Sequence, residues 1–507
     1  MSATSIMPRT NFRIDDLDAL GISITRLTSD SRSVQQGDTF VAYRGMQADG
    51  RNFIAQAIER GANAVIWEAQ EFTWNSEWHV PNLAVHDLRH RAGLIADRVY
   101  GHPSRKLWMV GVTGTNGKTS ISHWLARAYT ALGRKGAVLG TLGNGFPGAL
   151  QATANTTPDA LIVHALLAEY ERQDAKTVAM EVSSHALAQG RVNGVNFDLA
   201  LLTNLTRDHL DFHGDMQSYA AAKRRLFDWE NLKHAVLNLD DAFGAELAGQ
   251  LQDKPVEVVG YGLTRESLDL AERLGIRMVY GTLTQMDAQG LTLQLHTSWG
   301  AAAMQSKLLG RFNASNLLGA LAVLLVSEVD IDDAVRELGS QKAVAGRMQT
   351  LGGKDTPTVV VDYAHTPDAL EKVLNTLREV TEPAGGRVIC VFGCGGDRDR
   401  GKRPMMGTVA SKFADVRIVT NDNPRNEDPH EIINAIIAGM QGDFQVIEDR
   451  AKAVAFAIGK AQLNDTVLLA GKGHEDYQEI RGERKPFSDS EIAHRALSMW
   501  TPEERWL

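Results

Sequence analysis

The sequence contains little cysteine and no long apolar run. Its two cysteines, Cys390 and Cys394, are too few for a disulfide framework, and the three residues between them do not match the CxxC spacing of redox and zinc sites. We expect two buried thiols in a reducing cytoplasm. The longest apolar stretch, Leu317 to Val326, falls far short of the roughly 20 residues that a membrane span requires. It therefore predicts a buried helix and no transmembrane segment.

Positive charge and targeting signals are also scarce. The 53 Lys and Arg residues are outnumbered by 62 Asp and Glu residues, and the net charge of −9 argues against a nucleic-acid coat or a basic membrane-surface binder. The segment from Met1 to Asp16 contains no apolar run, so we expect no secretory signal. With 43% hydrophobic and 23% charged residues, the 507-residue chain has the composition of a globular protein that builds its cores without disulfides or structural metals.

Short apolar runs alternate with glycine-rich turns and amphipathic helices along most of the chain. Continuous runs of this kind predict strands of a parallel sheet that helices cover on both faces, and therefore an α/β fold. Between Leu291 and Leu295, leucines alternate with polar residues, which predicts a small antiparallel extension with one face in water. The continuous runs are 107–110, 177–180, 199–202 and 358–361.

Two breaks divide this pattern into three domains. Gly101–Ser104 precedes a new strand and a nucleotide-type loop, and Gln341–Met348 precedes another strand and a glycine-rich stretch. We predict domains at 1–102, 103–345 and 346–507, in agreement with a usual size of about 150 residues per domain.

The strongest chemical signal is the glycine-rich segment Gly111–Thr119, which reads GVTGTNGKT between a predicted strand and a predicted helix. Glycines let backbone N–H groups turn toward phosphate oxygens, and the helix N-terminus adds partial positive charge. Lys118 would neutralise the β and γ phosphates, and the Thr119 hydroxyl would hold Mg²⁺. The chain has no NKxD guanine signature, which weakens a GTPase interpretation. The predicted nucleotide-binding residues of this segment are Gly114, Thr115, Asn116, Gly117, Lys118, Thr119 and Ser120.

Acidic, histidine and lysine residues follow the predicted strands of the same region. Glu181 ends one apolar run, and His209 follows the end of the next. Because the carboxyl ends of parallel strands face the ligand crevice, both side chains could contact a magnesium nucleotide on the glycine-rich loop. A helix-capping carboxylate and an ordinary loop histidine are equally compatible with these positions. From the residues alone, Lys223 belongs to a solvated basic helix face.

Taken in chain order, a set of motifs resembles the Mur ligase family, the ATP-dependent amide-bond ligases that build the peptide of bacterial peptidoglycan. The resemblance extends from about residue 28 to the end of the chain. It is most specific at Asp422–Arg425, supported by 393–398 and 471–475, where the chain resembles the member that adds meso-diaminopimelate. The other motifs are GTNGKT at 114–119, EVSSH at 181–185, Asn204 with Asp208 and His209, GRFNASN at 310–316, GRM at 346–348 and DYAHTP at 362–367.

The resemblance implies an activity and a role for each domain. The enzyme would add meso-2,6-diaminopimelate to the D-glutamate γ-carboxylate of UDP-N-acetylmuramoyl-L-alanyl-D-glutamate through an acyl phosphate, in the bacterial cytoplasm. An N-terminal domain would hold the UDP end of this substrate, and a central P-loop domain would bind ATP. A C-terminal domain with a dinucleotide-binding-like fold would bind the amino acid. The partners would be these small molecules and not nucleic acid, and we expect a monomer.

The resemblance also implies site residues. Lys223 would be carbamylated by CO₂ and would then hold Mg²⁺ together with Thr119, Glu181 and His209, while Lys118 completes the catalytic set. The family often has histidine where this chain has Met46, so the contact expected there is through the backbone. Further ATP contacts would come from Asn313, Asn316, Arg347 and Asp362. The UDP-sugar peptide would contact Ser29, Ser31, Met46, Gln47, Ala48, Asn155, Thr156, Thr157, Ser183, Gln189 and Arg191. Diaminopimelate would contact Arg398, Asp422, Asn423, Pro424, Arg425, Gly471 and Glu475.

Two other classes of protein share parts of this pattern. A ligase of the folylpolyglutamate synthase type has a similar loop and acyl-phosphate chemistry, but it lacks the UDP-binding domain, and here about 100 residues precede the loop. A P-loop ATPase that acts as a switch on a protein partner would hydrolyse ATP without small molecules, whereas the ligase would require both of its other substrates.

Overall fold

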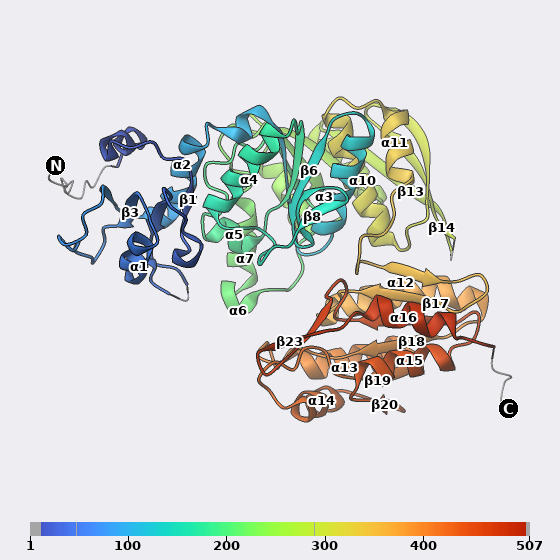
Figure 1. The fold of residues 1–507 in the computed structure, drawn as a ribbon. Coiled ribbons are helices and arrows are strands. Elements are labelled where there is room, and N and C mark those ends of the chain that lie inside the picture. The colour runs from blue at the N-terminus through green and yellow to red at the C-terminus, as the bar shows by residue number, and fades with distance from the viewer. Residues whose placement is uncertain (1–11, 47, 288, 503–507) are drawn as a thin grey trace. The chain divides into compact units, whose positions relative to one another are not determined.

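The computed structural model describes residues 12–46, 48–287 and 289–502 (Figure 1). The chain divides into two compact units, each of which is considered by itself. The first unit comprises the described residues up to Thr203, Gln217–Leu237 and Glu246–Val259. The second comprises Asn204–Met216, Asn238–Ala245 and the described residues from Gly260 onward.

The N-terminal part of the first unit is a parallel sheet in the order β1–β2–β3–β4. Successive side chains of a strand point to opposite faces. Along β3, Ile66 packs with Leu88 in one apolar cluster, and Val65 and Trp67 pack with Ile54 in another, so both faces are buried. The elements are η1 (Ile14–Leu20), β1 (Leu27–Thr28), η2 (Ser31–Ser33), β2 (Thr39–Ala42), η3 (Gly50–Phe53), α1 (Ile54–Glu59), β3 (Ala64–Glu68), β4 (Asn82–Val85), α2 (Leu88–Val99) and η4 (Pro103–Lys106).

The rest of the first unit contains a second sheet, in which strands follow the order β11–β10–β5–β9–β6–β7–β8. Neighbours pair in parallel from β11 to β6, and β7 and β8 continue the edge antiparallel. Three predicted runs correspond to β5, β9 and β10, which confirms them as buried parallel strands. The elements are β5 (Trp108–Thr113), α3 (Lys118–Ala131), β6 (Gly136–Gly140), β7 (Gly143–Phe146), β8 (Ala149–Gln151), α4 (Ala160–Arg172), β9 (Thr177–Glu181), α5 (Ser184–Ala188), β10 (Leu199–Leu202) and β11 (His234–Asn238).

The second unit begins with short segments and an antiparallel sheet. In β14, Leu291, Leu293 and Leu295 are buried between β13 and β15, whereas Gln294 and His296 are exposed, which confirms the predicted extension with one wet face. The predicted apolar helix is also confirmed, because every residue from 317 to 326 is buried in α10. The elements are α6 (Leu210–His213), α9 (Arg265–Leu274), β13 (Arg277–Asp287), β14 (Gly290–Thr297), β15 (Gly300–Ser306), α10 (Arg311–Val326) and α11 (Ile331–Gly339). Four elements fall partly in each unit, namely β11, α7 (Met216–Arg224), α8 (Ala242–Gln250) and β12 (Glu257–Gly262).

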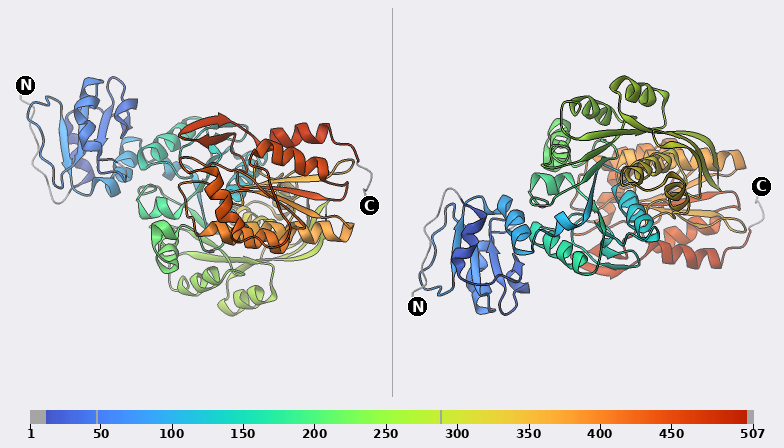
Figure 2. Two further views of the ribbon diagram at one scale, coloured as in Figure 1. Left: turned by 90° about the horizontal axis from the view of Figure 1, so that it is seen from below. Right: turned by 90° about the horizontal axis from the view of Figure 1, so that it is seen from above.

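The C-terminal part of the second unit is a sheet in the order β16–β17–β21–β18–β19–β20, parallel except for β16. Figure 2 shows its helices on both sides: α12, α13 and α14 pack in one apolar cluster, and α15 and α16 in another. The elements are β16 (Gln349–Gly352), β17 (Thr358–Asp362), α12 (Pro367–Thr381), η5 (Glu382–Ala384), β18 (Val388–Phe392), α13 (Lys402–Phe413), β19 (Val416–Val419), α14 (Pro429–Ile437), β20 (Gln445–Val446), α15 (Arg450–Lys460), β21 (Thr466–Ala470), β22 (Tyr477–Ile480), β23 (Glu483–Pro486) and α16 (Asp489–Ser498).

The predicted α/β class, with parallel sheets and a small antiparallel part, is confirmed. Cys390 and Cys394 are both buried as free thiols, as expected, and burial raises the pKa of each to about 12. Within the described residues, no helix has the length and apolar character needed to cross a membrane.

Candidate active site

The glycine-rich loop joins β5 to α3, and its backbone suits a bound phosphate. Gly114 (φ 142°) and Gly117 (φ 88°) adopt angles that other residues disfavour, and α3 begins directly at Lys118. The first N–H groups of a helix have no partner within it, so they are available to an anion. Lys118 Nζ donates to the carbonyl oxygens of Gly114 (2.8 Å) and Thr115 (2.9 Å). The ammonium is therefore held at the loop, where it would neutralise nucleotide phosphates.

A buried carboxylate lies beside this loop at the end of β9. Glu181 accepts hydrogen bonds from the Thr119 hydroxyl (2.8 Å) and from the N–H (2.8 Å) and hydroxyl (3.1 Å) of Thr141. A Cβ at Gly140 would lie 2.2 Å from a Glu181 oxygen, so only glycine fits there. Carboxylate and hydroxyl oxygens are suitable Mg²⁺ ligands, and Glu181 and Thr119 are already in contact. Thr141 was not predicted, because it stands outside the recognisable motifs.

Lys223 corrects the interpretation made from the residues alone. Its side chain is not on a solvated helix face: the residue is 1% exposed, and its Nζ donates to the Gly114 carbonyl (2.8 Å). The amine also lies 4.5 Å from the ring centre of Tyr219, whose hydroxyl contacts the Thr115 hydroxyl (3.1 Å). This face of α7 packs against the phosphate loop, which local charge pattern cannot reveal.

Several residues predicted for the UDP-sugar peptide lie next to this carboxylate. The Thr157 hydroxyl donates to the Glu181 carbonyl (2.8 Å) and accepts from the Ser183 N–H (3.1 Å). The Thr141 hydroxyl donates to the Glu181 carboxylate and also contacts the Thr156 hydroxyl (3.0 Å). These contacts connect predicted substrate residues to predicted metal ligands within the first unit.

Arg191 lies near both this group and Tyr43, the residue that follows β2. Its Nη1 donates to the Thr157 carbonyl (2.9 Å), and its Nε donates to Gln189 (2.9 Å). Burial lowers the pKa of Arg191, and the nearby Asp159 carboxylate opposes this shift. Burial also raises the pKa of Tyr43, which Asp159 raises further and a hydrogen bond with Ser29 opposes. Ser29 and Arg191, which were predicted to contact the UDP-sugar peptide from two different domains, therefore both lie near Tyr43.

The remaining residues predicted to contact the UDP-sugar peptide make fewer contacts with one another. Ser31 is buried and donates to the Gln56 side chain (2.7 Å). Met46 is 65% exposed, and Ala48 and Asn155 are exposed as well. The backbone of Ala48 accepts a hydrogen bond from the Gly45 N–H (2.8 Å). Gln47 lies outside the described residues.

The other predicted nucleotide and metal residues belong to the second unit. Asn313 and Asn316 are buried on α10 and share a hydrogen bond (3.4 Å). Asp362 accepts from the Met348 N–H (2.8 Å); burial raises its pKa, and Arg347 opposes this shift. His209 caps α6 in a left-handed conformation (φ 53°).

Three loops predicted to bind diaminopimelate leave the carboxyl ends of adjacent strands. Parallel β18 lies between β21 and β19, and these strands lead into 393–398, 471–475 and 421–425. Loops at this edge of a parallel sheet meet at one place, which is where α/β proteins bind ligands. Behind them, the fully buried Arg450 pairs with Asp489 (2.7 Å) and donates to the Ala470 carbonyl (2.9 Å).

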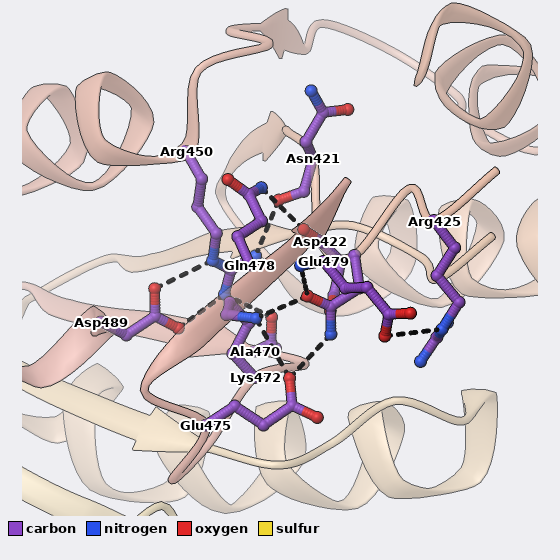
Figure 3. Close-up of polar contacts among 11 residues, drawn as sticks. Asn421, Asp422, Arg425, Arg450, Ala470, Lys472, Glu475, Gln478, Glu479 and Asp489 are labelled. Carbon is purple, nitrogen blue, oxygen red and sulfur yellow. Dashed lines mark hydrogen bonds and ion pairs between the residues drawn. The ribbon is translucent and has the colours of Figure 1, made fainter. Parts of the chain in front are cut away.

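Side chains connect these loops (Figure 3). Asn423 Nδ2 donates to Glu475 Oε2 (2.8 Å), and Lys472 Nζ donates to Asn423 Oδ1 (3.0 Å) and to Glu475 Oε2 (3.0 Å). The Gln478 side chain donates to the Asp422 carbonyl (2.7 Å), which attaches β22 to the same loop. A Cβ at Gly471 would lie 2.4 Å from an Asp422 carboxylate oxygen. The structure thus brings Asp422, Asn423, Gly471 and Glu475 together.

Arg425 lies at the edge of this group. Its backbone is left-handed (φ 51°) and is held by β22, because its N–H donates to the Glu479 carbonyl (3.0 Å). Its Nη1 donates to the Gly396 carbonyl (2.8 Å), and its Nε lies 3.5 Å from a Glu479 carboxylate oxygen. Guanidinium has five N–H donors, so donors remain for a ligand carboxylate. Arg398, by contrast, is exposed.

Three family models match the chain. They are described as Mur ligase family, catalytic domain (residues 23–100), Mur ligase middle domain (112–324) and Mur ligase, glutamate ligase domain (346–473). The chain belongs to the Mur ligase family. The predicted recognition is therefore confirmed, and the chain is a ligase.

Individual members of the Mur ligase family resemble the chain over almost its whole length. A protein of Chromobacterium violaceum named UDP-N-acetylmuramoyl-L-alanyl-D-glutamate–2,6-diaminopimelate ligase is 54% identical over 489 residues, covering 96% of each chain. A protein of the same name from Nitrosomonas europaea is 49% identical and covers 95% of this chain and 94% of its own. A solved structure with that name is 37% identical to this chain, with a TM-score of 0.67, and the match covers 94% of this chain and 95% of the other.

Proposed function

We propose that the chain is an ATP-dependent ligase that adds meso-2,6-diaminopimelate to the D-glutamate γ-carboxylate of UDP-N-acetylmuramoyl-L-alanyl-D-glutamate, in peptidoglycan synthesis. One observation supports the choice of amino acid most directly. Arg425 lies next to the connected group of Asp422, Asn423 and Glu475, within the matched ligase family. A cation and carboxylates at one place suit an amino acid whose far end is itself a carboxylate and an ammonium.

The phosphate loop would activate the substrate carboxylate. Phosphoryl transfer from ATP to this carboxylate forms an acyl phosphate and ADP, and negative charge builds up between three anions. Lys118 and the N–H groups at the start of α3 would stabilise that charge. The amine of diaminopimelate then attacks the acyl carbon, and the tetrahedral intermediate expels phosphate to leave the amide.

Thr119 and Glu181 would hold Mg²⁺, which neutralises phosphate charge when bound. Lys223 would complete the site as a carbamate, formed when its neutral amine reacts with CO₂ and releases a proton. The burial of Lys223 beside the Gly114 carbonyl supports a role in the site, because a lysine that has no such role usually remains exposed to water. His209 would be a further ligand.

The residues around Tyr43 and Thr157 would hold the UDP-sugar peptide. The contacts of Ser29, Thr156, Thr157, Ser183, Gln189 and Arg191 within the first unit support this assignment. The same proposal divides the chain into a UDP-sugar domain (1–102), an ATP domain (103–345) and an amino-acid domain (346–507), in which Asn313, Asn316, Arg347 and Asp362 would contact ATP.

We further propose a cytoplasmic monomer that does not bind nucleic acid. Three members of the basic cluster Arg398, Arg400, Lys402 and Arg403 have partners within the protein. Arg403 and Arg400 both pair with Glu427 (2.9 and 3.1 Å), and Lys402 donates to the His365 carbonyl (2.8 Å). These pairs support a structured loop and not a nucleic-acid surface.

The test is to incubate the full chain with ATP, Mg²⁺, the UDP-dipeptide and meso-diaminopimelate, and to follow ADP release and product mass. The expected result is one UDP-tripeptide per ATP, with hydrolysis dependent on both other substrates. ATP hydrolysis that is equally fast without them would instead identify a switch. Product formation from a folate and glutamate would identify the folylpolyglutamate type.

A further inference from the structure

Lys472 is a buried ammonium at the centre of the polar network in the second unit (Figure 3). It follows β21, is 0% exposed, and its Nζ contacts Asn423 and Glu475 at 3.0 Å each. The ring centres of Tyr477 and Phe487 lie 5.6 and 5.8 Å from Nζ. Removing an ammonium from water is costly, and replacing a buried ion pair by apolar residues is often neutral for stability. Folding alone therefore does not explain a lysine here.

The partners of Asn423 permit only one orientation of its amide. The Lys472 ammonium and the Glu479 N–H (3.0 Å) can only donate, so the amide oxygen must face them. The amide nitrogen then faces Glu475 Oε2 (2.8 Å), which accepts. If the Lys472 ammonium were removed, the Asn423 amide oxygen would keep only one of these two donors, the Glu479 N–H. Glu475 would also lose the cation beside it.

Glu475 is held through one oxygen. Lys472 and Asn423 both donate to Oε2, and in Figure 3 the other carboxylate oxygen of Glu475 points away from Lys472. This arrangement leaves the other oxygen outside the hydrogen bonds with Lys472 and Asn423, while these two donors hold the carboxylate in place.

We propose that Lys472 is a positioning residue for diaminopimelate. Its ammonium fixes the Asn423 amide and the Glu475 carboxylate, and these two side chains contact the ligand's far end. Lys472 itself does not touch the ligand. This inference rests on the proposed function.

The test uses the full-length Lys472→Met variant, which keeps the length of the side chain and removes its donors. We expect the KM for meso-diaminopimelate to rise about 10- to 100-fold, with a smaller change in kcat and an unchanged KM for ATP. Because the effect passes through Glu475, the changes caused by Lys472→Met and Glu475→Gln should be strongly non-additive in a double-mutant cycle.

The matched control is Lys485→Met on β23, where the lysine is exposed and the same change should leave the KM unaltered. Thermal unfolding checks the fold; if the methionine variant does not fold, Lys472→Gln gives the same readout. A folded variant with an unchanged diaminopimelate KM, or with effects that simply add, overturns the proposal. A wild-type enzyme that does not use diaminopimelate overturns the proposed function instead.

Discussion

The phosphate loop and the amino-acid site are built in opposite ways. The loop is local: Gly111–Thr119 supplies the glycines, the helix N-terminus and Lys118, and the carbonyls that hold Lys118 belong to the same segment. The amino-acid site joins distant segments through side chains, as when Asn423 contacts Glu475 across 52 positions of the chain. A site made of backbone can therefore be recognised in a contiguous motif, whereas a site made of side chains from several strand ends needs the fold.

Substitutions in the two regions should also change the kinetics differently, and the largest loss of activity is expected for the phosphate loop. Lys118→Ala should reduce kcat by roughly 10³-fold or more with every amino acid, because the transferring phosphate loses its main cation. Steady-state ADP release measures this, and an unchanged melting temperature shows that the fold is intact. A folded variant with near-normal turnover would refute the assignment.

The next effect concerns Lys223, which lies at the loop but comes from a separate helix. Lys223→Ala should reduce kcat by about 10²-fold, because the proposed carbamate no longer supplies an anionic metal ligand. Adding a small carboxylate such as formate should restore part of the activity by taking its place. Full activity of the Lys223→Ala variant would count against carbamylation. So would mass spectra and electron density that show an unmodified Lys223 amine in the active enzyme.

A smaller and more selective effect is expected in the amino-acid site. Arg425→Ala should raise the KM for meso-diaminopimelate by about 10- to 100-fold, because the far carboxylate loses a charged hydrogen-bonding partner, while the KM for ATP stays unchanged. The exposed Arg336→Ala on α11 is a matched control. If ATP and diaminopimelate were affected equally, the two sites would not be separable in the way proposed here.

The smallest expected effect is a pH dependence of the free energy of unfolding, caused by an ion pair near the amino-acid loops. Hydrogen bonds from Arg403 hold the pKa of Glu427 at about 2, below its ordinary 4.5. Because the folded pKa is the lower one, this stabilisation is present above about pH 4.5 and is lost as the pH falls toward 2. The free energy of unfolding of the wild type should thus exceed that of Glu427→Gln by more at about pH 6 than at about pH 3. A difference that does not vary with pH contradicts the pairing.

The contrast also explains what the sequence could and could not predict. The apolar runs identify β5, β9 and β10, and GKT identifies the loop, because these signals are local. Lys223 was misjudged from its neighbours, since its burial depends on how α7 packs. Arg450 and Asp489, which pair at 0% exposure across 39 positions, gave no sequence signal. The diaminopimelate residues were predicted only through the family resemblance, because composition alone allows Asp422–Arg425 to be a polar turn.

The most direct test of the account compares two amino acids in the wild-type enzyme. L-Lysine matches meso-diaminopimelate except for the far carboxylate, so it would leave the Arg425 guanidinium without its ligand partner. The account predicts that kcat/KM, measured with the UDP-dipeptide and ATP, is at least about 100-fold higher for meso-diaminopimelate than for lysine. Equal efficiency with both amino acids would contradict it.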